Sequence, residues 1–535
     1  MYIEPNTNIR LIKNCPLDKS QENTIYFTSR AAQTTYFTST LNGLLFEKNS
    51  YQRVNKGKFR IAINAEAIYN YNYLAFQNYS FGDRWFYAFI DKIEYINNVT
   101  SEITYTLDIM QTWHFSYELE QCFVEREHSV TDEIGDNIVL EKLDTGEYLS
   151  TDFSFPSDLN NMSYVLFCTI NEAYDPVDGL VSQDLFSGLY PVTFEDDPDP
   201  LDPSYKSGAD KLKDWVSHLP ITKQEAIVSG CVMPYKLVHR PNVYMEHTVN
   251  KNTTLIRSDG TQVKNNKCLT YPYNFLYVTN FQGKSAEYRY EFFDKTQSTA
   301  KFYLDGGCNP NPAVFIFPYN YKIEAPSQLS NKENRDEGFY LTGYPQIAWN
   351  IDAFKAWLAQ SASTLLTTWM TGGAATLATM AGVSLGMGAL ASPVLPAVAL
   401  VGMAVNGVVH AAQPPQSKGS TSGASQFQAH NMNFGFMNKH ITPEYATIID
   451  DYFSMFGYAT NKVKIPNRNA RPEWNYVKTI GCKIQGINSG FGGLPADDAE
   501  QIEEIYNRGV RFWTNPAHIG NYSYNNAPTI QGGES

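Results

Sequence analysis

The sequence contains one long stretch without formal charge. Lys355 and Lys418 enclose 62 consecutive residues that include no Asp, Glu, Lys or Arg, although charged residues make up 18% of the chain. Ala, Gly, Val, Leu and Met dominate residues 371–409 within it. A segment of this composition must bury its surface in protein or in lipid, because large exposed apolar patches lead to aggregation.

Two prolines divide this stretch into two apolar runs. A helix needs about 20 apolar residues to span the hydrocarbon core of a bilayer. Residues 373–391 nearly reach that length, Pro393 and Pro396 then interrupt the pattern, and residues 397–412 form a second, shorter run. A polar linker of flexible composition follows at residues 413–423. The pattern predicts an apolar helical hairpin and not one long span.

Small residues in the first run favour close contacts between helices. Gly382 and Gly386 form a G-x-x-x-G motif, and Ala378 lies four residues earlier on the same face. Such stripes let helices approach closely in lipid. The residues expected to insert into a membrane or to plug a lumen are Trp357, Leu366, Trp369, Gly372, Gly373, Ala378, Gly382, Gly386, Pro393, Pro396, Val401, Gly407 and Val409.

Two other interpretations of the apolar stretch stay open. A buried pair of core helices is disfavoured by the seven glycines from Gly372 to Gly407, since each costs about 1 kcal/mol relative to Ala in a helix interior. A permanent membrane anchor is disfavoured because a polar, aromatic sequence resumes after the stretch. Conditional insertion into a membrane is therefore the preferred hypothesis.

The rest of the sequence predicts antiparallel sheet. Tyr, Phe and Trp make up 14% of the chain, and aromatic residues are enriched in strands. Apolar and polar residues alternate over Glu102–Ile109, and the preceding run 84–90 is apolar on both faces. Asn97-Asn98 is expected to turn the chain between these two strands.

Further turns and a few helices complete the pattern. Hairpin turns are expected at Asp259-Gly260 and around Gly283. Helices are expected over 209–216, from a Thr442 cap to Gly457, and from an Asp497 cap to Arg508. The predicted fold class is mainly β, with antiparallel barrels or sandwiches, a few docked helices and an inserted apolar loop or helical hairpin. The expected domains are 1–130, a β-rich middle at 131–345, the apolar loop and linker at 346–440, and 441–535.

Charge and cysteine content exclude several classes. The net charge of −14 argues against a general nucleic-acid-binding surface, which would be basic, but it permits a negative wall past which DNA slides. The seven cysteines are scattered without a C-x-x-C pair, so buried free thiols are expected and not disulfides or a zinc site. The first residues lack a secretory signal pattern, so synthesis in the cytoplasm is expected.

Motifs with catalytic or metal-binding chemistry are weak. Residues 382–386 match the G-x-S-x-G nucleophile elbow, but no strand precedes them. Glu125-Arg126-Glu127-His128 would place its two acids on one face of a strand and its two bases on the other, so no local metal site is expected. The acidic, proline-rich run 195–203 is expected to be a solvated loop, with a calcium site as the alternative. We expect no catalytic residue, no metal and no cofactor.

Several strings taken together resemble one family. They are Leu17-Asp18, Thr24–Phe27, Trp85–Ile90, Gln111–Trp113, Glu125–His128, Leu269–Leu276, Trp349–Asp352, Ile441–Tyr445 and Gly509–Trp513. In this order they resemble the tail-knob, or distal tail-tube, proteins of small short-tailed bacteriophages with protein-primed linear genomes. The strings extend over nearly the whole chain, which makes the resemblance fairly specific.

The resemblance implies a structural virion protein. It implies a homohexameric tube at the distal end of the tail, with the walls built by residues 1–130 and 441–535 and joined to the upper tail tube protein. Six apolar loops, matching roughly residues 356–413, would plug the lumen and later form a pore with lipids of the host cytoplasmic membrane. Double-stranded DNA would then pass without sequence-specific binding. A pore-forming toxin and a cell-wall-degrading tail component are the alternatives.

Overall fold

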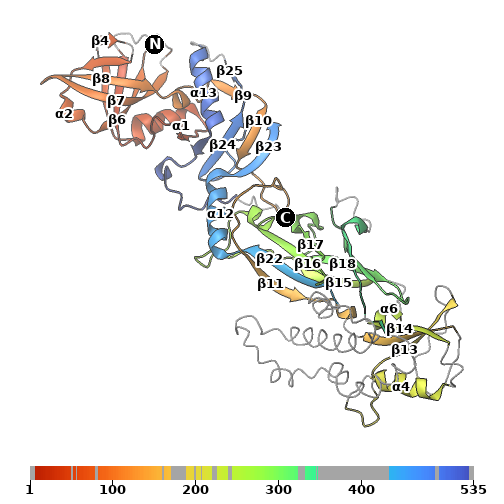
Figure 1. Cartoon of the computed structure of the whole chain (residues 1–535). Coiled ribbons are helices and arrows are strands. Elements are labelled where there is room, and N and C mark those ends of the chain that lie inside the picture. Colours follow the sequence, from red (N-terminus) through yellow and green to blue (C-terminus); the bar gives the residue numbers. More distant parts are fainter. Residues whose placement is uncertain are drawn as a thin grey trace, which may run out of the picture. The chain divides into compact units, whose positions relative to one another are not determined.

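The computed structural model describes residues 7–49, 52–55, 57–78, 82, 84–159, 162–169, 188–197, 201–206, 208–219, 226–238, 244–322, 332–344, 346–347, 433–487 and 493–528. The chain forms two compact units (Figure 1). Unit 1 comprises Met1–Thr145, Thr254–Leu269 and Pro443–Ser535, and unit 2 comprises Gly146–Thr253 and Thr270–Thr442. The chain therefore passes between the units four times. The prediction of a mainly β fold is confirmed.

The larger sheet of unit 1 has seven strands and is coloured red to orange in Figure 1. In spatial order they are β3 (Gly43–Asn49), β1 (Thr7–Lys13), β6 (Tyr71–Gln77), β7 (Trp85–Asn97), β8 (Thr100–Leu107), β5 (Lys58–Ile61) and β4 (Gln52–Asn55). The predicted hairpin is confirmed, because β7 and β8 pair antiparallel and Asn97 lies opposite Thr100. Ile109, however, does not belong to the strand. Asp108 accepts a hydrogen bond from the Gln111 amide and so ends the strand and caps a helix.

A second sheet of unit 1 joins the two ends of the chain. Its order is β2 (Asn23–Ile25), β26 (Val510–Trp513), β24 (Trp474–Ile480), β10 (Cys122–Glu127) and β23 (Tyr458–Lys464). β2 and β26 pair in parallel, and the other pairs are antiparallel. A short pair, β9 (Tyr117–Leu119) with β25 (Ile484–Gly486), also links early and late sequence. Unit 1 thus needs both ends of the chain.

Residues Thr254–Leu269 are bound into unit 1 by a fully buried carboxylate. Asp450 accepts hydrogen bonds from the backbone amides of Lys264 and Asn265 at 3.0 and 2.9 Å, and it forms an ion pair with Arg257. The predicted turn at Asp259-Gly260 is confirmed, since the Gly260 amide donates to the Arg257 carbonyl. A buried charge is tolerable only when it is paired and hydrogen-bonded, as this one is.

The described strands of unit 2 form three sheets of four strands each. The first is β11 (Tyr148–Ser154), β22 (Gly435–Ile441), β16 (Asn274–Thr279) and β17 (Ser285–Tyr288); the second is β13 (Tyr190–Phe194), β12 (Met162–Cys168), β14 (Ile227–Pro234) and β21 (Gln346–Ile347); the third is β15 (Met245–Asn250), β18 (Thr299–Gly306), β19 (Val314–Tyr319) and β20 (Phe339–Leu341). The turn expected around Gly283 joins β16 to β17. One continuous apolar core connects the three sheets.

The helices are short and few among the described residues. They are α1 (Arg30–Thr35), followed by a π-turn (Tyr36–Thr40), α2 (Ala65–Ile68), α3 (Ile109–Thr112), α4 (Gly208–His218), α6 (Tyr235–Val238), α12 (Pro443–Phe456) and α13 (Ala496–Arg508). The three predicted helices are present as α4, α12 and α13. Asp497 is not the cap of α13, because Pro495 occupies that position and Asp497 lies in the first turn. There its charge still favours the helix N-terminus.

The prediction of buried free thiols is confirmed for six of the seven cysteines. All seven cysteines are free, and all but the half-buried Cys308 are buried. Burial raises the pKa of several of these thiols, for example to about 12 for Cys15 and for Cys168. These thiols therefore stay protonated and behave as small apolar side chains.

Substitutions of Gly457 and Gly481 would show how closely the chain packs around each glycine in unit 1. Both have positive φ, +63° and +65°. A Cβ on Gly457 would lie 2.3 Å from the Glu127 carbonyl oxygen, whereas nothing lies within 4 Å of one on Gly481. We expect Gly481→Ala to lower the free energy of unfolding by about 1 kcal/mol through backbone strain. Gly457→Ala should lower it by about 2–4 kcal/mol, because the neighbouring strand must also move. Urea denaturation compares the two variants, and equal effects would contradict the packing argument.

Candidate functional site

The predicted apolar residues, from Trp357 to Val409, all lie outside the described residues, which break off after Ile347 and resume at Asn433. The structure thus neither brings these residues together nor separates them. It does describe the strand before the segment, β21, and the strand after it, β22. These two strands belong to different sheets of unit 2.

The chain before the segment is fixed by backbone pairing. In β21, Gln346 lies opposite Cys231 and Ile347 opposite Gly230, both in β14. Just upstream, the Gln282 side chain donates to the Thr342 carbonyl at 2.6 Å and accepts from the Thr342 amide at 3.2 Å. This reciprocal pair holds the approach to β21 in one register.

The chain after the segment is fixed by side chains. Asn433 donates to the Pro156 carbonyl at 3.1 Å, and its side-chain oxygen accepts from the Phe434 amide at 2.8 Å. Phe434 is fully buried, and its ring lies 5.6 Å from that of Phe339. The described chain therefore resumes directly inside the core of unit 2.

β22 continues this attachment as an inner strand between β11 and β16. A Cβ on Gly435 would lie 2.4 Å from the Phe281 ring, so a larger residue there would force that ring to move. Phe436 packs on His247 and Phe302, with ring centroids 4.4 and 5.0 Å away. Burial lowers the pKa of His247 to about 4, which keeps this ring neutral near pH 7.

The Glu125–His128 motif has a structural role, and its predicted alternation is wrong. A β-bulge between Val124 and Arg126 interrupts the alternation of β10. Arg126, Glu127 and His128 are all buried, because protein covers both faces of the chain there. Arg126 donates to the Gly457 carbonyl and pairs with Glu141. Bulges change strand alternation in this way because they add one residue to one strand.

His128 is fully engaged by backbone groups. Its Nδ1 accepts from the Tyr476 amide at 2.8 Å, so its Nε2 carries the proton and donates to the Ser454 carbonyl at 3.1 Å. Burial and the nearby Arg471 lower its pKa to about 3. A histidine with both nitrogens occupied offers no free base, which agrees with the structural interpretation of the motif.

Two carboxylates of the acidic run 195–203 bind groups in the first turns of α4. Asp196 accepts from the Gly208 amide at 2.6 Å and from the Tyr205 hydroxyl at 3.0 Å. Asp197 pairs with Lys211 at 2.6 Å, and this hydrogen bond lowers its pKa. Across the described ranges, no three His, Cys, Asp or Glu side chains cluster as metal ligands would. Within the same ranges, no helix combines the length and apolarity needed to cross a bilayer.

Sequence reasoning missed a buried ion cluster and a pocket in unit 1. Glu141 and Lys267 pair although 126 residues separate them, and Arg30 and Arg84 line one pocket. No local pattern signals such partners, because the spacing between them along the chain is set only by the fold.

The buried His128 and Asp108 in unit 1 should affect acid stability with opposite signs. His128 stays neutral in the folded state down to about pH 3, whereas it takes up a proton near pH 6.5 when unfolded. Because only the unfolded chain takes up this proton, His128 lowers the free energy of unfolding as the pH falls below about 6.5. Burial raises the pKa of Asp108 to about 6. The unfolded chain therefore releases this proton first, and Asp108 lowers the free energy of unfolding as the pH rises from about 4 to 6.

We therefore expect His128→Gln to flatten the rise of the unfolding free energy with pH, by up to about 1.4 kcal/mol per pH unit. Asp108→Asn, which can keep the cap of α3, should steepen that rise. Urea denaturation between pH 4.5 and 6 measures both slopes. Parallel slopes in the wild type and the two variants would refute the assigned protonation states.

Two family models match the chain, one near its N-terminus and one over its C-terminal half. Residues 239–527 match the C-terminal domain of tail knob protein gp9 of Bacillus phage phi29. Residues 5–118 match the N-terminus of the caudoviral major tail protein.

Known proteins match nearly the whole length. The chain is 24% identical over 604 residues to tail knob protein gp9 of Bacillus phage PZA, covering 97% of this chain and 98% of that relative. It is 23% identical over 612 residues to tail knob protein gp9 of Bacillus phage phi29, with the same coverage. The solved tail knob protein gp12 of bacteriophage C1 has a similar fold, with a TM-score of 0.59 at 14% identity over 98% of this chain and 99% of that one.

The resemblance of the quoted strings to tail-knob proteins is thus confirmed by a family model that spans more than half of the chain. The chain belongs to the family of phage tail knob proteins represented by gp9 of Bacillus phage phi29.

Proposed function

We propose that this protein forms the distal tube of a short phage tail as a homohexamer, and that its apolar segments plug the tube until host contact. On release they insert into the host cytoplasmic membrane and open a path for the genome. The observation that carries the proposal is the 62-residue uncharged stretch, which the described chain flanks with strands fixed in unit 2. Tail knob membership supports a structural role in the virion tail.

The physical argument is that one segment has two alternative places of burial. Six apolar segments that face one another inside a ring bury surface that would otherwise aggregate. Lipid offers the same segments a second favourable environment. A switch needs two states of similar free energy, and a trigger that binds one of them better. The seven glycines in the stretch favour such a change, because they leave the backbone many conformations.

The attachment of both flanks supports the same proposal. β22 is an inner strand, and Phe434 and Phe436 are buried in the core of unit 2. Extrusion of the segment would therefore leave unit 2 folded, and the composition of residues 413–423 is that of a linker. The wall roles of residues 1–130 and 441–535 and the attachment to an upper tail tube protein belong to this proposal.

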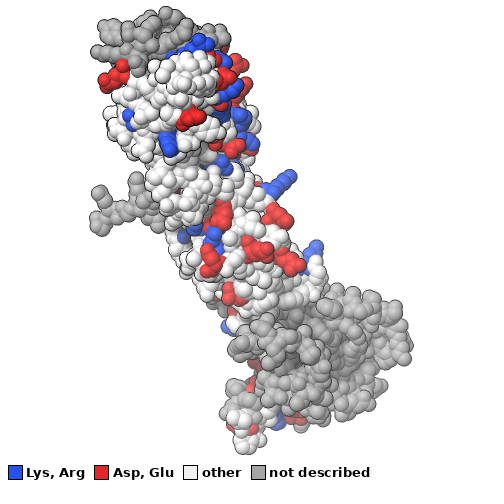
Figure 2. All heavy atoms as spheres, turned by 90° about the vertical axis from the view of Figure 1, so that its left-hand side faces the viewer, with Lys and Arg blue, Asp and Glu red and all other residues white. Residues whose placement is uncertain are grey.

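Net charge is consistent with passage of DNA. Each copy carries −14, so that six copies carry −84, and a negative lumen would repel phosphates and avoid the contacts with Lys and Arg that retain DNA. On the face drawn in Figure 2, acidic and basic side chains occur together between broad uncharged areas. We therefore propose a weakly interacting bore, without sequence-specific binding. Catalysis has no part in this proposal.

A liposome assay tests membrane insertion. A peptide of residues 356–412 should release dye from liposomes, and the full-length protein should do so only after a trigger. Ala378→Asp should abolish release, since a charge at the centre of a membrane helix costs about 3 kcal/mol. Ala412→Asp, which adds the same charge at the last residue of the peptide, is the matched control and should leave release intact. An inert peptide would rule out insertion.

A deletion tests whether the segment is needed for folding. Removing residues 371–409 should leave a soluble hexamer, because both flanking strands keep their partners. Sedimentation velocity and electron micrographs of the purified variant measure the assembly. A variant that no longer assembles would show that the segment is part of a core.

A further inference from the structure

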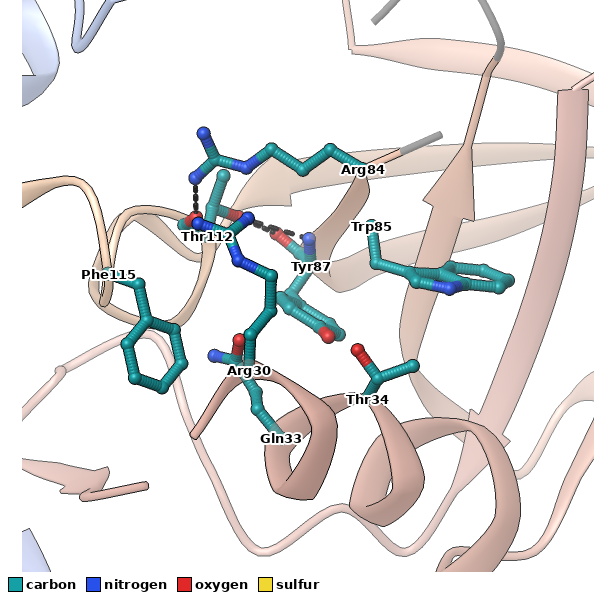
Figure 3. A pocket seen from close by; sticks show the side chains of 8 residues that line it. All are labelled: Arg30, Gln33, Thr34, Arg84, Trp85, Tyr87, Thr112 and Phe115. Atoms are coloured by element: carbon teal, nitrogen blue, oxygen red, sulfur yellow. Dashed lines mark hydrogen bonds between the residues drawn. The ribbon is translucent and has the colours of Figure 1, made fainter. Parts of the chain in front are cut away.

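A pocket in unit 1 brings two arginines together (Figure 3). Its walls come from α1, from the start of β7 and from the end of α3. Arg30 and Arg84 line it together with Trp85, Tyr87 and Phe115, and it is partly open to solvent. Figure 3 shows the Arg84 guanidinium bonded to the Thr112 carbonyl, with the Arg30 side chain extending from α1.

Arg84 is held rigidly on one wall of the pocket. Its guanidinium donates to the Thr112 carbonyl and lies 4.4 Å from the ring centroid of Trp113. Its Nε is buried and has no hydrogen-bond partner. Burial and the charge of Arg30 lower the pKa of Arg84 to about 10. Both effects indicate a positive charge that lacks compensation.

Arg30 supplies a second, exposed positive charge. Its guanidinium carbon lies 5.8 Å from the ring centroid of Phe115. Neither arginine forms an ion pair with a carboxylate in the described part of the chain. Some other arginines described in the same unit, such as Arg60 and Arg126, do pair with a carboxylate, whereas others do not. The pocket differs from these sites because it brings two guanidinium groups together. An orphaned buried donor of this kind normally has a partner, because leaving it unpaired costs free energy.

We propose that this pocket is a carboxylate-binding site, and that its occupant is an acidic side chain of a second copy of the chain. The planar guanidinium fork suits a carboxylate, and a second arginine adds charge without crowding the first. Trp85 and Phe115 provide apolar walls for the alkyl stem of Asp or Glu. A free phosphate has no such stem. Each copy has 55 acidic against 41 basic side chains, so surplus carboxylates are available on every neighbour.

The proposal rests on the self-association in the proposed function but needs neither six copies nor a membrane. It makes the pocket one of the contacts between copies. A half-buried guanidinium that gains a carboxylate gives orientation as well as affinity, because the paired hydrogen bonds fix the angle between the groups. Lysine offers no planar fork, so the Arg84→Lys variant should bind the carboxylate more weakly than the wild type does.

Ligand binding tests the pocket itself. Glutarate, a carboxylate on an alkyl stem, should raise the thermal midpoint of the full-length protein above that in sodium chloride of equal ionic strength, because a ligand stabilises the state it binds. The rise should vanish in Arg84→Gln and shrink in Arg84→Lys. It should persist in Arg335→Gln, which removes an exposed arginine of unit 2 that pairs with Asp305. No rise in the wild type, a rise that survives in Arg84→Gln, or a larger rise with inorganic phosphate would each overturn the carboxylate assignment.

Sedimentation tests the occupant. Arg84→Gln should weaken self-association at least tenfold, and glutarate should weaken that of the wild type, while Arg335→Gln should associate normally. Normal association of Arg84→Gln, in a variant that no longer binds glutarate, would overturn the second copy as occupant. A wild type that stays monomeric at every concentration would refute the second copy and the hexamer of the proposed function together, while the glutarate result would still decide on the carboxylate site.

Discussion

The need to cover a long apolar segment dominates this protein. A stretch of 62 residues without charge cannot remain in water, and every proposed state of the protein gives it a partner, protein or lipid. On both sides of the segment the described chain is firmly attached to unit 2. β21 pairs with β14 before the segment, and Phe434 enters the core immediately before β22. Such attachment confines any large change to the residues between the two strands.

Unit 1 follows a different principle, in which distant segments complete one another. β10 lies between β24 and β23, so a strand from the first quarter of the chain is paired on both edges by strands from the last. Glu141 pairs with Arg126 and Lys267, and all three are buried. Removing one partner from such a cluster leaves an uncompensated charge, which is costly. The cluster therefore ties Thr254–Leu269 to the rest of unit 1.

The two units thus divide their tasks in a way that fits a tail knob protein. Unit 2 carries the flanks of the apolar segment, while unit 1 contains the pocket with Arg30 and Arg84. A segment that changes its environment benefits from attachment to a unit whose core does not depend on it. Contacts between copies benefit from a unit whose side chains are fixed, because rigid groups lose less entropy on binding.

The sequence alone determined the local elements. Hairpin turns at Asn97-Asn98 and Gly283, the helix from Pro443 to Phe456 and the free cysteines follow from nearest-neighbour chemistry, and all are present. The tail-knob resemblance also came from short strings. Composition also indicates which apolar residues insert into a membrane or plug a lumen, and that role stays a prediction. Only the tertiary structure decided the bulge before Arg126, the partner of Lys267 and the meeting of Arg30 with Arg84. These depend on contacts between residues far apart in the chain, which no local pattern encodes, because burial and charge pairing are set by the whole fold.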